Sequence, residues 1–169
     1  MKVYSGRRVV AGDAARRDVT VVVQHVLSHG ADGRGLTGEP NLGRARPLTH
    51  IAYHSPDGFE WGYAGSGPAD LALAVLADHF EEPPDLVRAA LSSLWASRSK
   101  AATLHQQLKQ RFFAGEPGDE WKLRSDEIDV WLQTPVIRER LAELAREDAE
   151  LAEIRRMDDA ESADAGPSH

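Results

Sequence analysis

The chain of 169 residues contains no cysteine, which excludes disulfides, thiolate metal sites and a cysteine nucleophile. It has no apolar run close to the roughly 20 residues that a helix needs to span a bilayer. Residues 1–5 also lack the apolar core of a signal peptide. These absences predict a cytoplasmic protein without a membrane span, and we expect no cofactor.

The residues that are present fit a folded domain with a solvated surface. Hydrophobic residues make up 41% of the chain and charged residues 28%, so a core of ordinary size can form. The formal net charge is −7; the acidic excess lies in residues 61–169, whereas residues 1–60 are slightly basic. We expect one domain with a C-terminal appendage.

Residues 59–80 organise the rest of the sequence. Phe59, Trp61 and Tyr63 alternate with smaller or polar residues, and this pattern favours an extended strand. A glycine-rich turn follows, and Pro68 has the fixed φ that suits the first position of a helix. The remainder of the stretch is apolar on nearly every side, which predicts a buried helix.

Residues 54–73, with the sequence HSPDGFEWGYAGSGPADLAL, resemble the signature of DUF6166, a family of small bacterial, archaeal and phage proteins of unknown function. The likeness covers about four fifths of the chain and includes residues 2–7, 105–112, 121–123 and 131–132. Residues 81–103 are longer than the equivalent connection in the family, and residues 134–169 look like an addition. The resemblance implies a shared fold and an association with phages or other mobile elements, but no activity.

Several short strands are predicted in the N-terminal half. They are residues 2–4, which Gly6 ends, residues 9–10 as a candidate partner, the β-branched run 19–23, and a hairpin of residues 48–54 and 59–63. Pro56 and Gly58 occupy the positions that a β-turn favours between the two hairpin strands. The glycines and prolines of residues 30–47 predict a long mobile loop.

Further helices are predicted in the C-terminal half. Apolar spacing favours one helix or two stacked pieces over residues 86–113, with Asp85 as the cap and a weak place at residues 97–99. After a short extended piece at residues 121–123, Ser125 is expected to cap a helix. That helix is expected to bury three side chains, namely Ile128, Leu132 and either Val130 or Trp131.

The predicted fold class is α+β, with a small antiparallel sheet packed by two to three helices and an appended C-terminal amphipathic helix. Residues 1–133 form the domain in this prediction. Residues 134–157 form the appended helix, which Thr134 and Pro135 begin. Residues 158–169 are polar and acidic and predict a flexible tail.

The leading functional hypothesis is a non-enzymatic interaction or regulatory protein that binds a protein partner or associates with itself. The appended helix carries an apolar stripe at near-heptad spacing, formed by Ile137, Leu141, Leu144, Leu151 and Ile154. Asp148 interrupts this stripe, and the run is too short for an independent coiled coil. The stripe therefore predicts docking, either on the protein's own domain or on a partner.

The second hypothesis is an anion- or nucleic-acid-binding module. Gly65, Ser66 and Gly67 precede a predicted helix, whose free N–H groups attract phosphate. The candidate nucleic-acid contacts are Arg7, Arg8, Arg16, Arg17, Arg44 and Arg46. The turn lacks the lysine of a P-loop, and a strand that enters a buried helix often needs glycine for steric reasons alone.

The third hypothesis is a small enzyme of unknown reaction. Asp57, Glu60, Asp70 and Asp78 are candidate acid–base partners of His54 or His79, but no pattern fixes their distances and no catalytic residue is assigned. The histidines His25, His29, His50 and His54 form two pairs with a spacing of four. A strand would separate the members of a pair by about 13 Å, so we expect no metal site within either pair.

Overall fold

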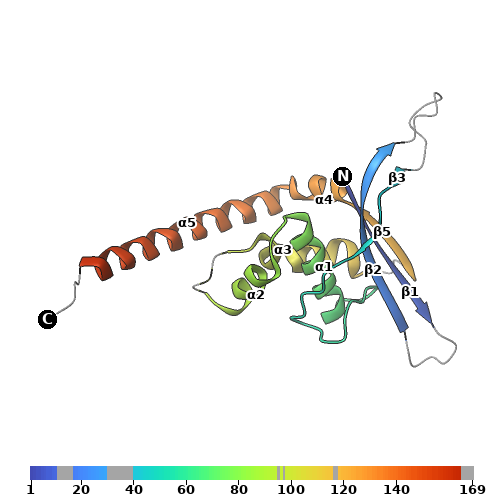
Figure 1. Cartoon of the computed structure of the whole chain (residues 1–169), viewed down its shortest axis with the longest axis horizontal. Helices are drawn as coiled ribbons and strands as arrows, with labels where there is room; N and C mark the ends of the chain where they lie inside the picture. The colour runs from blue at the N-terminus through green and yellow to red at the C-terminus, as the bar shows by residue number, and fades with distance from the viewer. Residues whose placement is uncertain (11–16, 30–39, 95, 97, 116–117, 165–169) are drawn as a thin grey trace.

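The computed structural model describes residues 1–10, 17–29, 40–94, 96, 98–115 and 118–164. One face of a twisted antiparallel sheet is covered by helices, and the last helix runs away from the sheet past the others (Figure 1). The strands are β1 (Lys2–Val10), β2 (Arg17–His29), β3 (Pro40–Leu42), β4 (Arg46–Pro47) and β5 (Glu120–Arg124). The helices are α1 (Ser66–His79), α2 (Pro84–Ser92), α3 (Lys100–Leu108), η1 (Lys109–Phe113), α4 (Ser125–Leu132) and α5 (Pro135–Asp164). The predicted α+β class is confirmed.

The sheet has the strand order β3-β2-β1-β5, with β4 paired to β2. Tyr4 of β1 lies between Val23 of β2 and Leu123 of β5, and all three side chains are buried on the side that faces the helices. The predicted strand at 19–23 and the extended piece at 121–123 are therefore confirmed as parts of β2 and β5.

The prediction that Gly6 ends the first strand is wrong. β1 continues through Gly6 to Val10 and pairs along its whole length with β2, so residues 9–10 are not a separate partner of residues 2–4. The indole of Trp121 from the neighbouring strand lies across Gly6, and a Cβ there would collide with it. Glycine stands in the strand because this close approach leaves no room for a side chain.

The predicted hairpin of residues 48–54 and 59–63 is also wrong, because this segment contains no strand. The backbone N–H groups of residues 53–55 donate to the Asp70 carboxylate of α1. The N–H of Gly62 donates to the carbonyl of Phe113 in η1 at 2.8 Å. The segment is thus a loop whose hydrogen bonds go to helices rather than to a partner strand. We call residues 48–65 the central loop.

The predicted loop at residues 30–47 is wrong in its second part. Residues 40–42 form β3 and residues 46–47 form β4, and both strands pair with β2. Residues 30–39 lie outside the described part of the chain. The short strands β3 and β4 pair with part of one edge of β2. The hydrophobic pattern of residues 40–47 alone does not predict this pairing.

The core helix α1 follows the prediction closely. It starts at Ser66, two residues before the expected Pro68, and its residues from Gly67 to Ala77 are buried. Gly65 is the N-cap residue, and no side chain caps the helix. Leu71, Leu73 and Leu76 are fully buried within the core.

The predicted break at residues 97–99 is confirmed, since α2 ends at Ser92 and α3 begins at Lys100. The Ser99 hydroxyl accepts a hydrogen bond from the Ala102 N–H at 2.9 Å and caps α3. The Glu82 carboxylate adds acceptors for the N–H groups of Lys100 and Ala101. Asp85 does not cap α2, because Pro83 holds that position.

The helix after β5 differs from the prediction at its start. Ser125 is not the cap; its hydroxyl accepts the backbone N–H of Lys2 at 3.0 Å and ties α4 to β1. Arg124 is the N-cap residue. Trp131 is buried and Val130 is 72% exposed, so the alternative left open between these two residues is settled in favour of Trp131.

Candidate functional site

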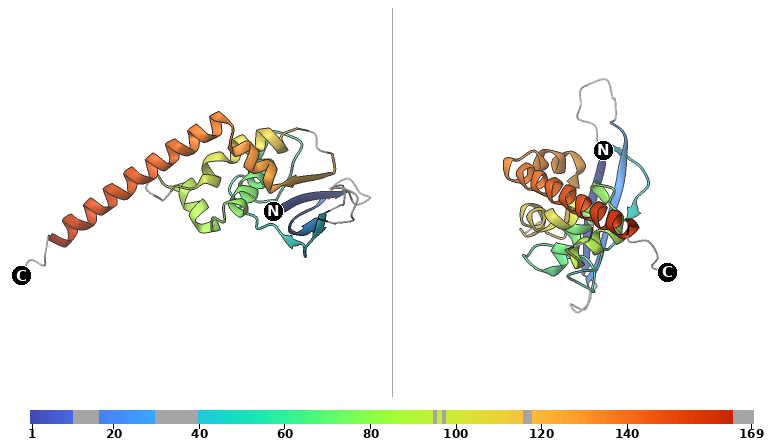
Figure 2. Two further views of the ribbon diagram at one scale, coloured as in Figure 1. Left: turned by 90° about the horizontal axis from the view of Figure 1, so that it is seen from above. Right: turned by 90° about the vertical axis from the view of Figure 1, so that its left-hand side faces the viewer.

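Helix α5 begins at Pro135, as predicted, and contains 30 residues. At a rise of about 1.5 Å per residue it is about 45 Å long. Its far end extends well beyond the other helices in Figure 1 and in the left view of Figure 2. Residues 158–164 belong to this helix, so the prediction of a flexible tail from residue 158 is wrong for these residues. No glycine or proline occurs between Pro135 and Gly166 to stop it.

Most of the apolar stripe on α5 is used within the chain. Ile137 belongs to the hydrophobic core, and Leu141 packs against it. Leu144 and Leu151 are also buried, with exposed fractions of 5% and 8%. Of the two uses that the sequence left open, docking on the protein's own domain is observed for these side chains. Ile154 differs, because 44% of its surface is exposed.

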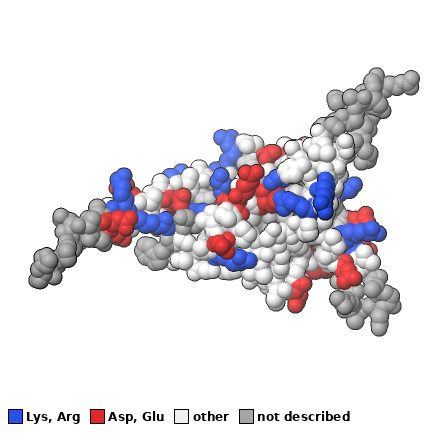
Figure 3. All heavy atoms as spheres, in the orientation of Figure 1, with Lys and Arg blue, Asp and Glu red and all other residues white. Residues whose placement is uncertain are grey.

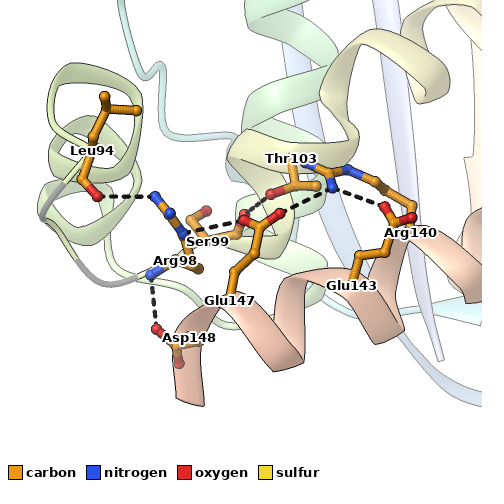
Figure 4. A network of polar contacts seen from close by, with 8 residues as sticks. All are labelled: Leu94, Arg98, Ser99, Thr103, Arg140, Glu143, Glu147 and Asp148. Atoms are coloured by element: carbon orange, nitrogen blue, oxygen red, sulfur yellow. Dashed lines mark hydrogen bonds and ion pairs between the residues drawn. The ribbon is translucent and has the colours of Figure 1, made fainter. Parts of the chain in front are cut away.

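A polar network fastens α5 to the segment before α3 (Figure 4). The backbone N–H of Arg98 donates to the Asp148 carboxylate at 3.1 Å, and its guanidinium lies 3.4 Å from Glu147. The same guanidinium donates to the carbonyl of Leu94 at 3.2 Å, and Arg140, two turns earlier in α5, lies 3.3 Å from Glu147. Asp148 interrupts the apolar stripe because its carboxylate binds this backbone N–H.

The part of α5 beyond Leu151 has a different environment. Every side chain from residue 152 to residue 159 is exposed, and the helix continues to Asp164. Ile154 and Met157 are the large apolar side chains of this part, and Met157 is 63% exposed. We call residues 152–164 the arm. The arm is the part of the predicted partner-binding stripe that the domain leaves uncovered.

The glycine turn before α1 is shaped by its neighbours. The ring of Tyr63 lies directly over Gly65, and Glu60 and the Tyr63 hydroxyl lie against Gly67. A Cβ at either glycine would collide with these atoms. The geometry therefore supports the steric role of the two glycines. Ser66 is exposed, and anion binding at Gly65, Ser66 and Gly67 stays a prediction.

Half of the six candidate arginines pair with carboxylates of the same chain. The pairs are Arg7 with Glu120, Arg8 with Glu60, and Arg46 with Asp78. Arg44 is exposed, only the backbone of Arg17 is described, and Arg16 lies outside the described residues. On the face seen in Figure 3, basic and acidic side chains are interspersed. The described residues form no continuous basic surface on this face, so the hypothesis of anion or nucleic-acid binding gains no support from it.

Asp78 of α1 joins the helix to the sheet. Its carboxylate accepts hydrogen bonds from the Tyr4 hydroxyl at 3.0 Å, from the Lys2 ammonium at 3.1 Å, and from Arg46. Partial burial alone would raise the pKa of Asp78, but the hydrogen bonds from Arg46, Lys2 and Tyr4 outweigh it and lower this pKa. Burial, together with the nearby Asp78 charge, raises the pKa of Tyr4. A pocket of about 360 Å³ opens beside this cluster.

The substitution Asp78→Asn is expected to destabilise the protein at neutral pH and to matter little in acid. Because the folded state lowers the pKa of Asp78, the carboxylate stabilises the fold above the unfolded pKa of about 3.8. This contribution is lost as the pH falls through the lower folded pKa. Melting temperatures of the wild type and the variant between pH 7 and pH 2.5 should converge toward low pH. A gap that is constant over this range would contradict the assignment.

Asp70 organises the central loop. Its side chain is fully buried and accepts the backbone N–H groups of Tyr53, His54 and Ser55 at 3.1, 2.9 and 2.9 Å. The Nε2 atom of His50 lies 3.3 Å from the same carboxylate. The proposed acid–base pairing of Asp70 with His54 is thus replaced by a contact to the His54 backbone. Asp70 fixes where the loop places its side chains.

The His54 ring meets a histidine that the sequence did not single out. The Nε2 atoms of His54 and His105 are 3.0 Å apart, and the amide nitrogen of Gln106 lies 2.9 Å from His105 Nε2. His105 Nδ1 donates to the carbonyl of Ala102 at 2.7 Å, so His105 Nε2 is the acceptor in this cluster. Burial lowers the pKa of His105. The ring is therefore neutral at physiological pH.

The other predicted candidates do not gather into a catalytic group. Glu60 pairs with Arg8, and His79 lies 3.1 Å from Asp129 of α4. His25 lies on β2 and His50 in the central loop, so neither predicted histidine pair is helical. No catalytic residue is assigned from these contacts.

The chain is thus a small α+β domain with a long C-terminal helix. Residues 4–83 match the model of DUF6166, a family of unknown function, which confirms the resemblance over this part of the chain. The matched part includes β1 from Tyr4 onward, the central loop and α1. The likeness expected at residues 105–112, 121–123 and 131–132 lies beyond the match and stays a prediction. No curated protein and no solved structure matches the chain. None of the helices in the described parts combines the length and apolar character of a membrane span.

Proposed function

We propose that the protein is a non-enzymatic interaction protein that associates with a second copy of itself through the arm of α5. The observation that carries this proposal is the uncovered end of a helix whose first part is docked. Side chains 152–159 are all exposed, Ile154 and Met157 among them. A helical segment of this length is marginal in water without packing, so a partner that covers it would stabilise it.

A second copy fits the charges around Ile154. Glu153 precedes this residue and Arg156 follows it, and within one helix the two side chains already pair at 2.6 Å. When two arms lie antiparallel about Ile154, the Glu153 side of one copy faces the Arg156 side of the other. Opposite charges then lie on either side of the two Ile154 side chains, and their attraction favours the antiparallel orientation. The contact is small, so the dimer is expected to be weak and concentration-dependent.

The double variant Ile154→Glu with Met157→Glu tests this proposal. Both side chains are exposed, so the variant should fold and melt like the wild type. Size-exclusion chromatography with light scattering at high protein concentration should show a dimer for the wild type and a monomer for the variant. Val136→Glu is the matched control, since Val136 is 73% exposed at the opposite end of α5. Equal masses for the wild type and the double variant would refute the proposal.

The localisation and biological setting are part of the same proposal. Composition supports a cytoplasmic protein, and the family resemblance supports an association with a phage or another mobile element. A partner of different sequence is the alternative occupant of the arm. If a different protein covers the arm, the wild-type chain would stay monomeric alone and would bind that purified partner. The same double substitution would abolish the binding.

A further inference from the structure

We propose that His54 and His105 bind a divalent transition-metal ion such as Zn²⁺, with the side-chain oxygen of Gln106 as a third ligand. His54 comes from the central loop, whereas His105 and Gln106 come from α3. Their polar ends converge, with Nε2 of His105 3.0 Å from Nε2 of His54 and 2.9 Å from the Gln106 amide. Imidazole nitrogen is a ligand that zinc, copper and nickel favour.

The separation of the two ring nitrogens is close to that in a metal site. Zinc binds histidine nitrogen at about 2.0–2.1 Å in tetrahedral geometry, which places two such ligands about 3.3 Å apart. The observed 3.0 Å is slightly shorter, and the ring planes are inclined by 30°. A small rotation of the His54 ring would open the space for the ion.

The atoms behind the ligands hold them in place. Nδ1 of His105 donates to the Ala102 carbonyl, which leaves the Nε2 lone pair for a metal; such a contact is usual for metal-bound histidines. The His54 backbone N–H is held by the buried Asp70 carboxylate. A half-turn of the Gln106 amide exchanges its nitrogen and oxygen and directs the oxygen toward the ion.

The proton balance of this site is simple. In the contact between the two rings, His54 Nε2 carries the proton, because His105 Nε2 is an acceptor. When the metal binds, that proton leaves Nε2 and the neutral His54 ring carries one on Nδ1 instead. Among the described residues no set of three or more His, Cys, Asp and Glu side chains forms a metal site. Water must therefore complete this coordination, and binding should be weaker than at a structural zinc site.

Isothermal titration of the full chain with zinc chloride tests the proposal. We expect one equivalent to bind to the wild type, and affinity to fall at least tenfold in His54→Gln and in His105→Gln. The control His25→Gln changes an exposed histidine of β2 and should bind as the wild type does. Magnesium chloride should give no binding, since Mg²⁺ favours oxygen ligands. Absence of zinc binding, or unchanged affinity in both His54 and His105 variants, would overturn the proposal.

A second measurement avoids substitution of His105, which is 5% exposed and contributes to packing. In NMR spectra of the wild type, substoichiometric Cu²⁺ should broaden the ring signals of His54 and His105 before those of the other five histidines. First broadening at any of the other rings would place the metal elsewhere and refute the assignment.

Discussion

The substitution Asp70→Ala is expected to lower the free energy of unfolding by about 3–5 kcal/mol. The buried Asp70 carboxylate accepts three backbone N–H groups from residues 53–55, and alanine leaves these donors without a partner. Because buried N–H groups without acceptors are costly, the central loop should lose its fixed position against α1. Urea denaturation measures the loss, and hydrogen exchange at residues 53–55 should accelerate selectively.

Two further variants separate the causes of this effect. Asp70→Asn keeps one oxygen acceptor and removes the charge, so its loss should be smaller than that of alanine. Asp57→Ala changes an exposed residue of the same loop and should lie within about 0.5 kcal/mol of the wild type. If Asp70→Ala were as stable as Asp57→Ala, Asp70 would not organise the loop.

The substitution Trp61→Ala should cost about 3–5 kcal/mol through the cavity it creates. Trp61 is 1% exposed, its ring packs edge-on against Trp121, and the Arg8 guanidinium lies 4.5 Å from the ring centroid. Its indole N–H donates to the carbonyl of Gly118 at 2.7 Å. The residue therefore connects the central loop to β1 and to the turn before β5.

The variant Trp61→Phe distinguishes packing from hydrogen bonding. It keeps most of the apolar volume and removes the N–H donor, so its unfolding free energy should lie between those of the wild type and Trp61→Ala. Chemical denaturation followed by circular dichroism is suitable, since removal of Trp61 changes the fluorescence signal. Equal stability of Trp61→Ala and the wild type would show that the loop is not anchored at this point.

The parts of the fold that the sequence predicted well are long periodic segments. The buried helix α1 and the β-branched strand β2 carry their patterns over many residues, and local preference agrees with tertiary packing there. The hairpin predicted at residues 48–63 does not form, although alternation and the turn residues both favour it. Trp61 is buried and Tyr63 is 47% exposed, so the two side chains do not share one face. A buried carboxylate from α1 takes the backbone donors that a strand would have used.

The candidate sites were predictable to different extents. The apolar stripe of α5 follows from spacing, but spacing cannot tell whether a domain or a partner covers it. Asp148 interrupts this stripe because it binds the Arg98 backbone, and this contact becomes visible only when α5 and the segment before α3 are placed side by side. The histidine cluster could not be found from the sequence, because His54 and His105 are 51 residues apart. Only the fold brings the central loop against α3.

Sedimentation velocity of the full-length chain over a wide range of protein concentration tests the central claim most directly. Association through the arm predicts a mass that rises with concentration from that of the 18.5 kDa monomer toward twice this value. A mass that stays at 18.5 kDa up to the highest concentration would contradict self-association.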